Sequence, residues 1–120
     1  LVSDEGAFRG GAILPGIGMS ARALHEFTDL LPKLEMQELR EAPQALGETT
    51  VDAMRSGLYW GAIGAVKELV VQLAHDSAEA PLVVLTGGAA PSVASRVAAD
   101  AIHAPNLVLS GIALTAGRAK

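Results

Sequence analysis

The chain has 120 residues, enough for one compact domain and too few for two ordinary ones. Half of the residues are hydrophobic and only 3% are aromatic, so we expect a core built from Ala, Val, Leu and Ile. The formal net charge is −4 and the nine basic residues are scattered, which argues against nucleic acid as a partner.

Composition also bears on metal sites, redox chemistry and location. The sequence has no Cys, which removes disulfides, Cys-based zinc sites and thiol catalysis. His25, His75 and His103 share no short spacing, so no metal site is predicted. No stretch reaches the roughly 18 apolar residues of a membrane-spanning helix, and no signal peptide is visible. We therefore expect a cytoplasmic protein with no membrane partner, and we interpret the start at Leu1 as a cut into a longer chain.

The N-terminal third predicts a hairpin followed by a helix. The Ser-Asp-Glu-Gly turn at residues 3–6 joins two short strands, and the second runs on through residues 10–14. A helical pattern begins at Ser20 and ends or kinks at Pro32, with an apolar face formed by Ala23, Leu24, Phe27, Leu30 and Leu31. The charged residues 33–46 are interpreted as a surface connection.

The longest predicted element is a helix that opens at residues 47–50 (Gly-Glu-Thr-Thr) and runs to about Ala74. We expect a threonine N-cap, with Asp52 near the positive end of the helix dipole. Gly57, Gly61 and Gly64 lie on one face of this helix, where each costs about 1 kcal/mol relative to Ala. Three such residues predict that another backbone packs against this face, either within the domain or across a two-fold axis.

Two strands and two helices are predicted in the C-terminal third. The apolar run at residues 82–85 predicts a strand buried on both faces, and a helix follows from Pro91 to about Ala101. Residues 107–109 predict a second buried strand, with a turn at 110–111 and a closing helix over 112–119. This order of elements predicts a mixed α/β domain.

Thr86-Gly87-Gly88, between a strand and a helix, is the strongest local indication of a binding site. Ligands bind beyond the carboxyl ends of strands in open α/β sheets, and glycines with a helix N-terminus behind them suit a nucleotide phosphate or ribose. A plain strand-to-helix turn would look the same. Similarly, residues 10–16 (Gly-Gly-Ala-Ile-Leu-Pro-Gly) are compatible with a bulged strand and tight turn, and Thr50 with a simple helix cap.

Taken in order, these segments resemble the type III pantothenate kinase family. The resemblance covers almost the whole chain. Each motif alone is weak, but the ordered set of motifs is specific. The matching stretches are residues 10–16 with Ala23-Leu24, Leu31-Pro32, residues 47–50 with Ser56-Gly57 and Gly61, Thr86-Gly87-Gly88, and residues 107–112.

The resemblance implies that residues 1–120 are the C-terminal domain of an actin-like ATPase (ribonuclease-H-like) fold, incomplete at its N-terminal strand. It implies ATP-dependent phosphorylation of pantothenate to 4′-phosphopantothenate, the first step of coenzyme A biosynthesis. It also implies a homodimer, a monovalent cation (potassium or ammonium) and magnesium bound with ATP. The alternative is a non-catalytic dimerisation or ligand-sensing module on the same fold.

Site residues follow from the resemblance motif by motif. Thr50 would bind pantothenate, and Thr86, Gly87 and Gly88 would bind the nucleotide. The residues expected at the cleft and the dimer interface are Gly10, Gly11, Pro15 and Gly16. The family's phosphate loop and its general-base aspartate have no match here, so no catalytic or metal-binding residue is assigned. We expect this segment alone to be inactive.

Overall fold

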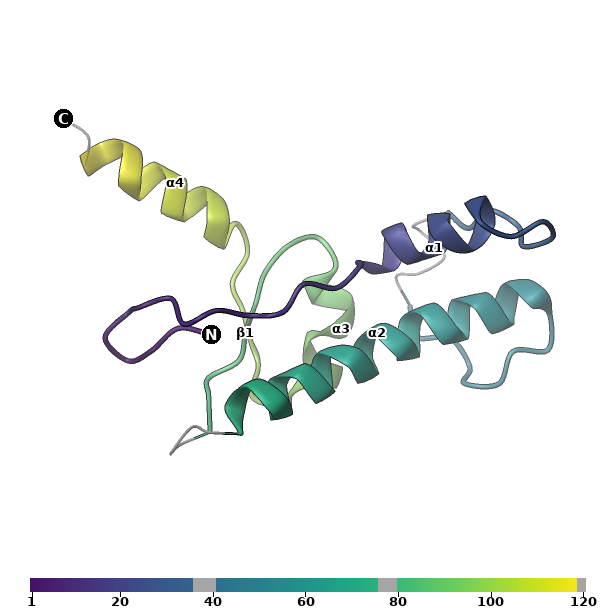
Figure 1. The fold of residues 1–120 in the computed structure, drawn as a ribbon, viewed down its shortest axis with the longest axis horizontal. Helices are drawn as coiled ribbons and strands as arrows, with labels where there is room; N and C mark the ends of the chain where they lie inside the picture. The colour runs from purple at the N-terminus through teal and green to yellow at the C-terminus, as the bar shows by residue number, and fades with distance from the viewer. Residues whose placement is uncertain (36–40, 76–79, 119–120) are drawn as a thin grey trace. The chain divides into compact units, whose positions relative to one another are not determined.

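In the computed structural model of the chain, residues 1–35, 41–75 and 80–118 are described. Their contacts form two compact units, Leu1–Ala80 (unit 1) and Pro81–Lys120 (unit 2). The prediction of one partial domain over residues 1–120 stays a prediction. The predicted mixed α/β class is confirmed, with this order of elements (Figure 1): α1 (Ile17–Glu26), α2 (Thr50–Ala74), β1 (Val84–Leu85), α3 (Ala90–Val97), β2 (Ile102–His103) and α4 (Leu107–Arg118).

The predicted N-terminal hairpin is present only as a turn with one antiparallel bridge, between Val2 and Phe8. The backbone N–H of Ser3 donates to the carbonyl of Ala7 at 2.9 Å, and Gly6 has the positive φ of 80° that the turn requires. The strand expected at residues 10–14 is wrong. Gly10 has a φ of 119°, outside the range of a strand, and although its carbonyl accepts from the N-terminal ammonium of Leu1 at 2.6 Å, residues 11–14 form no ladder with the described part of the chain.

Helix α1 begins at Ile17, three residues before the predicted start, and ends at Glu26 rather than at Pro32. Polar groups close its C-terminal end, because the Thr28 hydroxyl donates to the carbonyl of Leu24. Phe27 and Leu30, predicted on its apolar face, lie beyond the helix and are 80% and 91% exposed. That part of the predicted face is wrong.

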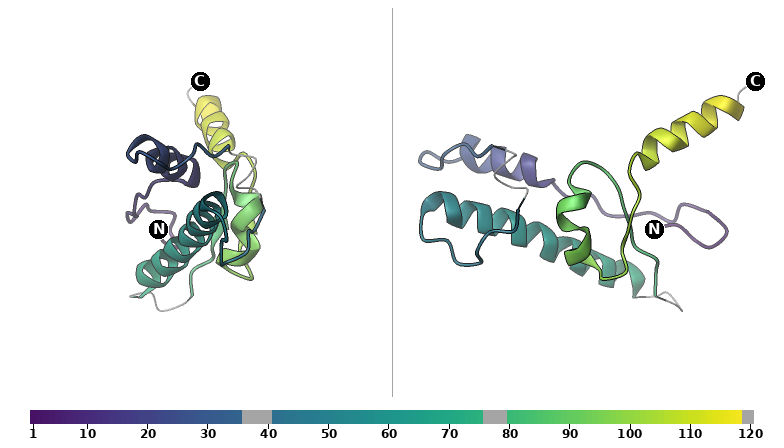
Figure 2. Two further views of the ribbon diagram at one scale, coloured as in Figure 1. Left: turned by 90° about the vertical axis from the view of Figure 1, so that its right-hand side faces the viewer. Right: turned by 180° about the vertical axis from the view of Figure 1, so that it is seen from behind.

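The core of unit 1 lies between α1 and α2. It is formed by Ala21, Leu34, Met54 and Leu58, with Ile17, Leu24, Leu31 and Val51 partly buried against them. The views in Figures 1 and 2 agree that α1 lies alongside the N-terminal part of α2. Leu34 corrects a prediction: residues 33–46 were expected at the surface, but this side chain is only 7% exposed because it belongs to the core.

Helix α2 has the predicted bounds, from Thr50 to Ala74, and its N-cap is Thr49. Side chains of the helix hold the segment before it: Ser56 donates to the carbonyl of Ala45, and Trp60 Nε1 donates to the carbonyl of Pro43 at 3.2 Å. No helix in the described part of the chain is both long enough and apolar enough to cross a membrane.

The glycine face of α2 (Gly57, Gly61 and Gly64) is exposed, and within unit 1 nothing described lies within 4 Å of the Cβ positions on it. The described residues of unit 1 therefore do not pack against this face, and a contact between two copies of the chain stays a prediction. Gly47 is different. A Cβ there would clash with the backbone of Asp52 and Ala53, so glycine is required where the chain approaches the first turn of α2.

The sheet of unit 2 consists of β1 and β2, which pair in parallel with Val84 opposite Ile102 and Leu85 opposite His103. The predicted burial of residues 82–85 on both faces is wrong, since Leu82 is 66% exposed and Val84 is 43% exposed. A sheet of two short strands leaves most of its surface open among the described residues. Helix α3 has a proline in its first turn as predicted, but it ends at Val97 instead of Ala101.

The second predicted strand, at residues 107–109, is wrong as well. These residues form the first turn of α4, and the strand that pairs with β1 lies at Ile102–His103. Asn106 separates the two with a φ of 58°, and its carbonyl accepts from the backbone N–H of Ser110 at 2.9 Å, which opens the helix. The side chains of Leu107, Val108 and Leu109 are exposed, not buried.

Candidate functional site

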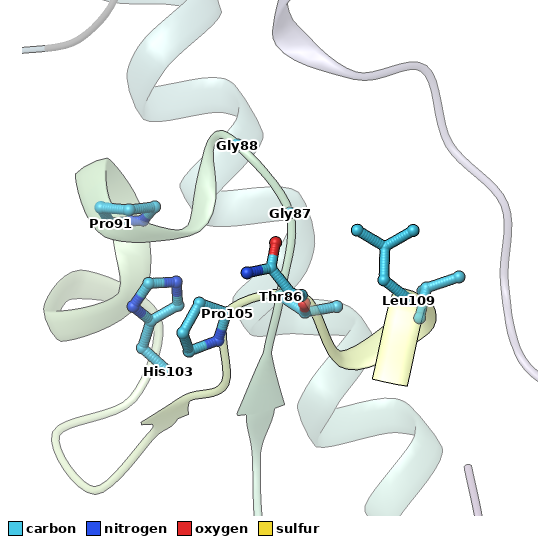
Figure 3. Close-up of a pocket in the computed structure, with 9 residues that line it drawn as sticks. Thr86, Gly87, Gly88, Pro91, His103, Pro105 and Leu109 are labelled. Atoms are coloured by element: carbon cyan, nitrogen blue, oxygen red, sulfur yellow. The ribbon is translucent and has the colours of Figure 1, made fainter. Parts of the chain in front are cut away.

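The main candidate site is a pocket of about 430 Å³ in unit 2, at the carboxyl ends of both parallel strands (Figure 3). Its size is within the range of pockets that hold small ligands. Every lining residue follows one of the two strands or ends it: Thr86, Gly87, Gly88, Pro91, His103, Pro105, Asn106, Val108 and Leu109. This is the edge of an open α/β sheet at which ligands are expected.

One wall of the pocket is the turn from β1 into α3. Gly87 has a φ of 93°, which strongly favours glycine, and its carbonyl accepts from the backbone N–H of Ala90 at 3.1 Å. A Cβ at Gly88 would meet nothing within 4 Å, so the backbone there is open to a ligand. Helix α3 has no side-chain N-cap, but its Ala90 N–H is engaged by Gly87 and Pro91 has no N–H, so the start of the helix contributes mainly the positive end of its dipole. The predicted Thr86, Gly87 and Gly88 thus lie together at the pocket.

The other wall comes from β2 and the turn after it. The backbone N–H of Ala104 donates to the carbonyl of Leu85 at 2.9 Å, which fixes His103 beside the end of β1. Pro105 and Asn106 follow directly and lead into α4. No site prediction from the sequence included His103, Pro105 or Asn106. The Pro105-Asn106 pair, two residues after His103, was a turn signal that could have indicated them.

Three polar side chains converge on this pocket: Thr86, His103 and Asn106. Within residues 1–35, 41–75 and 80–118, none of the three forms a hydrogen bond through its side chain. A hydroxyl, an imidazole and an amide can each both donate and accept. The pocket therefore offers a mixed set of hydrogen-bonding groups on a mostly apolar lining, which suits a ligand with a ring and polar edges.

Thr50, the predicted pantothenate residue, lies in unit 1 at the first position of α2. It is not the N-cap: Thr49 Oγ1 accepts from the backbone N–H of Asp52 at 3.1 Å and donates to the Asp52 carboxylate at 2.7 Å. The Thr50 side chain is exposed and forms no hydrogen bond with the part of the chain that the structure describes. Its hydroxyl is thus available for a ligand beside the positive end of the helix dipole.

The predicted cleft and interface residues lie in the irregular segment between the hairpin turn and α1. Gly10 has a positive φ, and Gly16 precedes α1 as its N-cap with its carbonyl accepting from the backbone N–H of Ser20 at 3.0 Å. A Cβ at Gly10, Gly11 or Gly16 would meet nothing within 4 Å. The structure thus places Gly10, Gly11, Pro15 and Gly16 in one stretch before α1 and does not test their role.

Unit 1 also has a smaller, charged hollow of about 350 Å³ beside the first turns of α1, lined by Arg22 and Lys33 among others. Lys33 Nζ lies 3.1 Å from Glu35 Oε1, and both side chains are well exposed, so this ion pair adds little to stability. In the described ranges, no three His, Asp or Glu side chains are grouped so that they could hold a metal ion.

The family model of type III pantothenate kinases matches residues 1–72, more than half of the chain. The chain is 46% identical over 93 residues to the type III pantothenate kinase of Dehalococcoides mccartyi. The aligned segment covers 78% of this chain and 35% of that protein. The chain is 37% identical over 119 residues to that of Acidiphilium cryptum (98% of this chain, 43% of the relative) and 33% identical over 119 residues to that of Listeria monocytogenes (99% and 45%). The chain therefore spans less than half the length of these relatives. It belongs to the type III pantothenate kinase family.

Proposed function

We propose that this chain is part of an ATP-dependent pantothenate kinase, which converts pantothenate to 4′-phosphopantothenate at the start of coenzyme A biosynthesis. Family membership is the observation that carries the proposal. In this reaction the hydroxyl of pantothenate attacks the γ-phosphate of ATP, and ADP leaves. Phosphoryl transfer depends chiefly on positioning and charge stabilisation, so the chain's part is to hold the two substrates.

The nucleotide is proposed to bind at the pocket of unit 2, with Thr86, Gly87 and Gly88 in contact with it. The open backbone at Gly88 and the positive end of the α3 dipole support this assignment, because both favour an anionic group close to the main chain. The Thr86 hydroxyl adds a donor and an acceptor for a ribose or a phosphate oxygen.

Pantothenate is proposed to bind at Thr50. The support is the unengaged hydroxyl at the start of α2, where neighbouring Thr49 already serves as the cap. Pantothenate carries a carboxylate, an amide and hydroxyls, and a threonine hydroxyl can bond to each of them.

The remaining family properties are proposals for the complete kinase. They are a C-terminal domain of an actin-like ATPase fold, a cleft and dimer interface that include Gly10, Gly11, Pro15 and Gly16, a homodimer and a cytoplasmic location. Magnesium with ATP and a potassium or ammonium ion belong to the same proposal. The described residues present no donor cluster that fits a metal, so neither ion is assigned to side chains of this chain.

The experiment is a coupled assay of ADP release by a protein of the relatives' full length that contains this chain, referred to below as the assembled kinase. We expect ADP release that depends on pantothenate and yields phosphopantothenate by mass spectrometry. The 120-residue chain alone is the control and is expected to be inactive. An assembled kinase that folds, yet releases no ADP with pantothenate and ATP present, would refute the proposal.

A further inference from the structure

We propose that His103, Pro91 and Pro105 form a slot for the flat base of the nucleotide, and that Asn106 selects adenine by its amide. This inference rests on the proposed nucleotide site and extends it to the base, for which neither the family motifs nor the glycine turn assigns a residue. It makes His103 and Asn106 the determinants of nucleotide specificity.

The first support is the arrangement of three rings. Pro91 comes from the first turn of α3, His103 from the end of β2, and Pro105 from the turn that follows, yet all three line one pocket. In Figure 3 these rings lie on one side of Thr86, whereas Leu109 lies on the other side. The imidazole of His103 is the planar surface on which a base can stack, and the saturated rings of the two prolines add apolar surface beside it.

The second support is the state of the His103 side chain. His25 has a hydrogen bond to the carbonyl of Leu31 at 2.8 Å, which gives its ring a structural role at the end of α1. His103 has no such bond in the described part of the chain and is exposed at the pocket. The ring is thus held by the strand but not engaged, so its face and its nitrogens are available to a ligand.

The third support is the chemistry of Asn106. Its backbone has a φ of 58°, a conformation that glycine would also supply, so the turn itself does not need the amide. The amide offers one donor and one acceptor, the pair that matches the N6 and N7 edge of adenine. Guanine presents two acceptors on the same edge and is matched by two donors instead. Asn106 therefore favours ATP over GTP.

The test uses the assembled kinase with ATP, GTP and inorganic tripolyphosphate, which has the phosphates but no base. The variants are His103→Ala, His103→Phe and Asn106→Gly, with Asp100→Ala as a control on an exposed residue of unit 2 outside the pocket. Michaelis constants are measured for ATP, GTP and pantothenate, and tripolyphosphate is titrated as a competitive inhibitor.

We expect His103→Ala to raise the KM for ATP roughly tenfold, as loss of base stacking would, while inhibition by tripolyphosphate and the KM for pantothenate stay unchanged. His103→Phe restores most of the ATP affinity because it keeps a flat ring. Asn106→Gly keeps the backbone conformation and reduces the preference for ATP over GTP roughly tenfold.

Two results would overturn the inference in distinguishable ways. If the kinase is active and both His103→Ala and Asn106→Gly retain wild-type constants for ATP and GTP, the base lies elsewhere and the proposed function stands. If His103→Ala weakens the binding of tripolyphosphate as much as the binding of ATP, the residue acts on the phosphates or on the fold, and the slot is refuted. A kinase without activity removes the proposed function and this inference together.

Discussion

Two adjacent threonines at the start of α2 allow stability and substrate binding to be separated. Thr49 is the N-cap, with its hydroxyl bonded to both the backbone N–H and the carboxylate of Asp52. Thr50 is the first helical residue, and its hydroxyl has no partner in the described part of the chain. Alanine at each position removes one hydroxyl from the same turn, so each variant is the control for the other.

The expected magnitudes follow from these bonds. Thr49→Ala removes a cap and should lower the free energy of unfolding by about 1 kcal/mol, which lowers the melting temperature by roughly 4 °C in a domain of this size. Thr50→Ala removes no intramolecular bond and should leave the melting temperature unchanged. If Thr50 holds pantothenate, the lost hydrogen bond lowers kcat/KM for pantothenate about tenfold or more, since about 1.4 kcal/mol is a factor of ten.

The assay is thermal unfolding of both variants together with steady-state kinetics of the assembled kinase against pantothenate and ATP. We expect a crossed result, in which Thr49→Ala loses stability and Thr50→Ala loses catalytic efficiency for pantothenate. A Thr50→Ala enzyme with wild-type constants for pantothenate would refute the binding role. Equal losses of efficiency in the two variants would show instead that the whole first turn matters and that Thr50 has no special part.

Core and glycine positions give three further predictions. Leu58→Ala should destabilise unit 1 by about 2–5 kcal/mol in denaturant unfolding, because it opens a cavity between α1 and α2. Val71→Ala, on the exposed part of the same helix, should destabilise much less. Equal losses of stability in the two variants would contradict the assigned core. Gly47→Ala should destabilise by its clash with the first turn of α2, whereas Gly61→Ala should stabilise by up to about 1 kcal/mol. Gly61→Leu should stabilise the monomer by a similar amount, because leucine is also a strong helix former and no described atom crowds this position, and an unchanged mass in sedimentation would exclude this face as the dimer contact.

Helix α2 could be predicted from the sequence almost to the residue, because local rules alone define it. A threonine cap with Asp52 three residues later marks its start, and 25 residues without proline continue it. Those rules could not predict which segments pack against the helix. The exposed glycine face and the buried Leu34 depend on which segment packs where, and that is decided by tertiary contacts.

Helix α1 and the hairpin were less predictable for a related reason. Phe27 and Leu30 continue the apolar spacing of α1, but side-chain bonds such as that of Thr28 end the helix earlier. Likewise, continuity with the hairpin cannot hold residues 10–14 in a strand when no described segment forms a ladder with residues 11–14. Both errors treat a local pattern as sufficient where the structure depends on a partner.

The position of β2 had the largest consequence for the site. Residues 107–109 are a short apolar run, which can belong to a strand or to a helix, and Ser110-Gly111 after it resembles a turn. The structure puts the strand five residues earlier, at Ile102–His103, and accepts a glycine inside α4 at a cost of about 1 kcal/mol.

That shift changes which residues lie beside Thr86-Gly87-Gly88. With a strand at 107–109, the turn next to the pocket would be Ser110-Gly111, whose small side chains add little beyond a hydroxyl. With the strand at Ile102–His103, the bond from Ala104 to Leu85 places an imidazole there, and Pro105 and Asn106 follow it. The glycine turn can be recognised from the sequence because its motif is contiguous. The opposite wall depends on the pairing of two short strands, so the residues that would distinguish one base from another become visible only when that pairing is known.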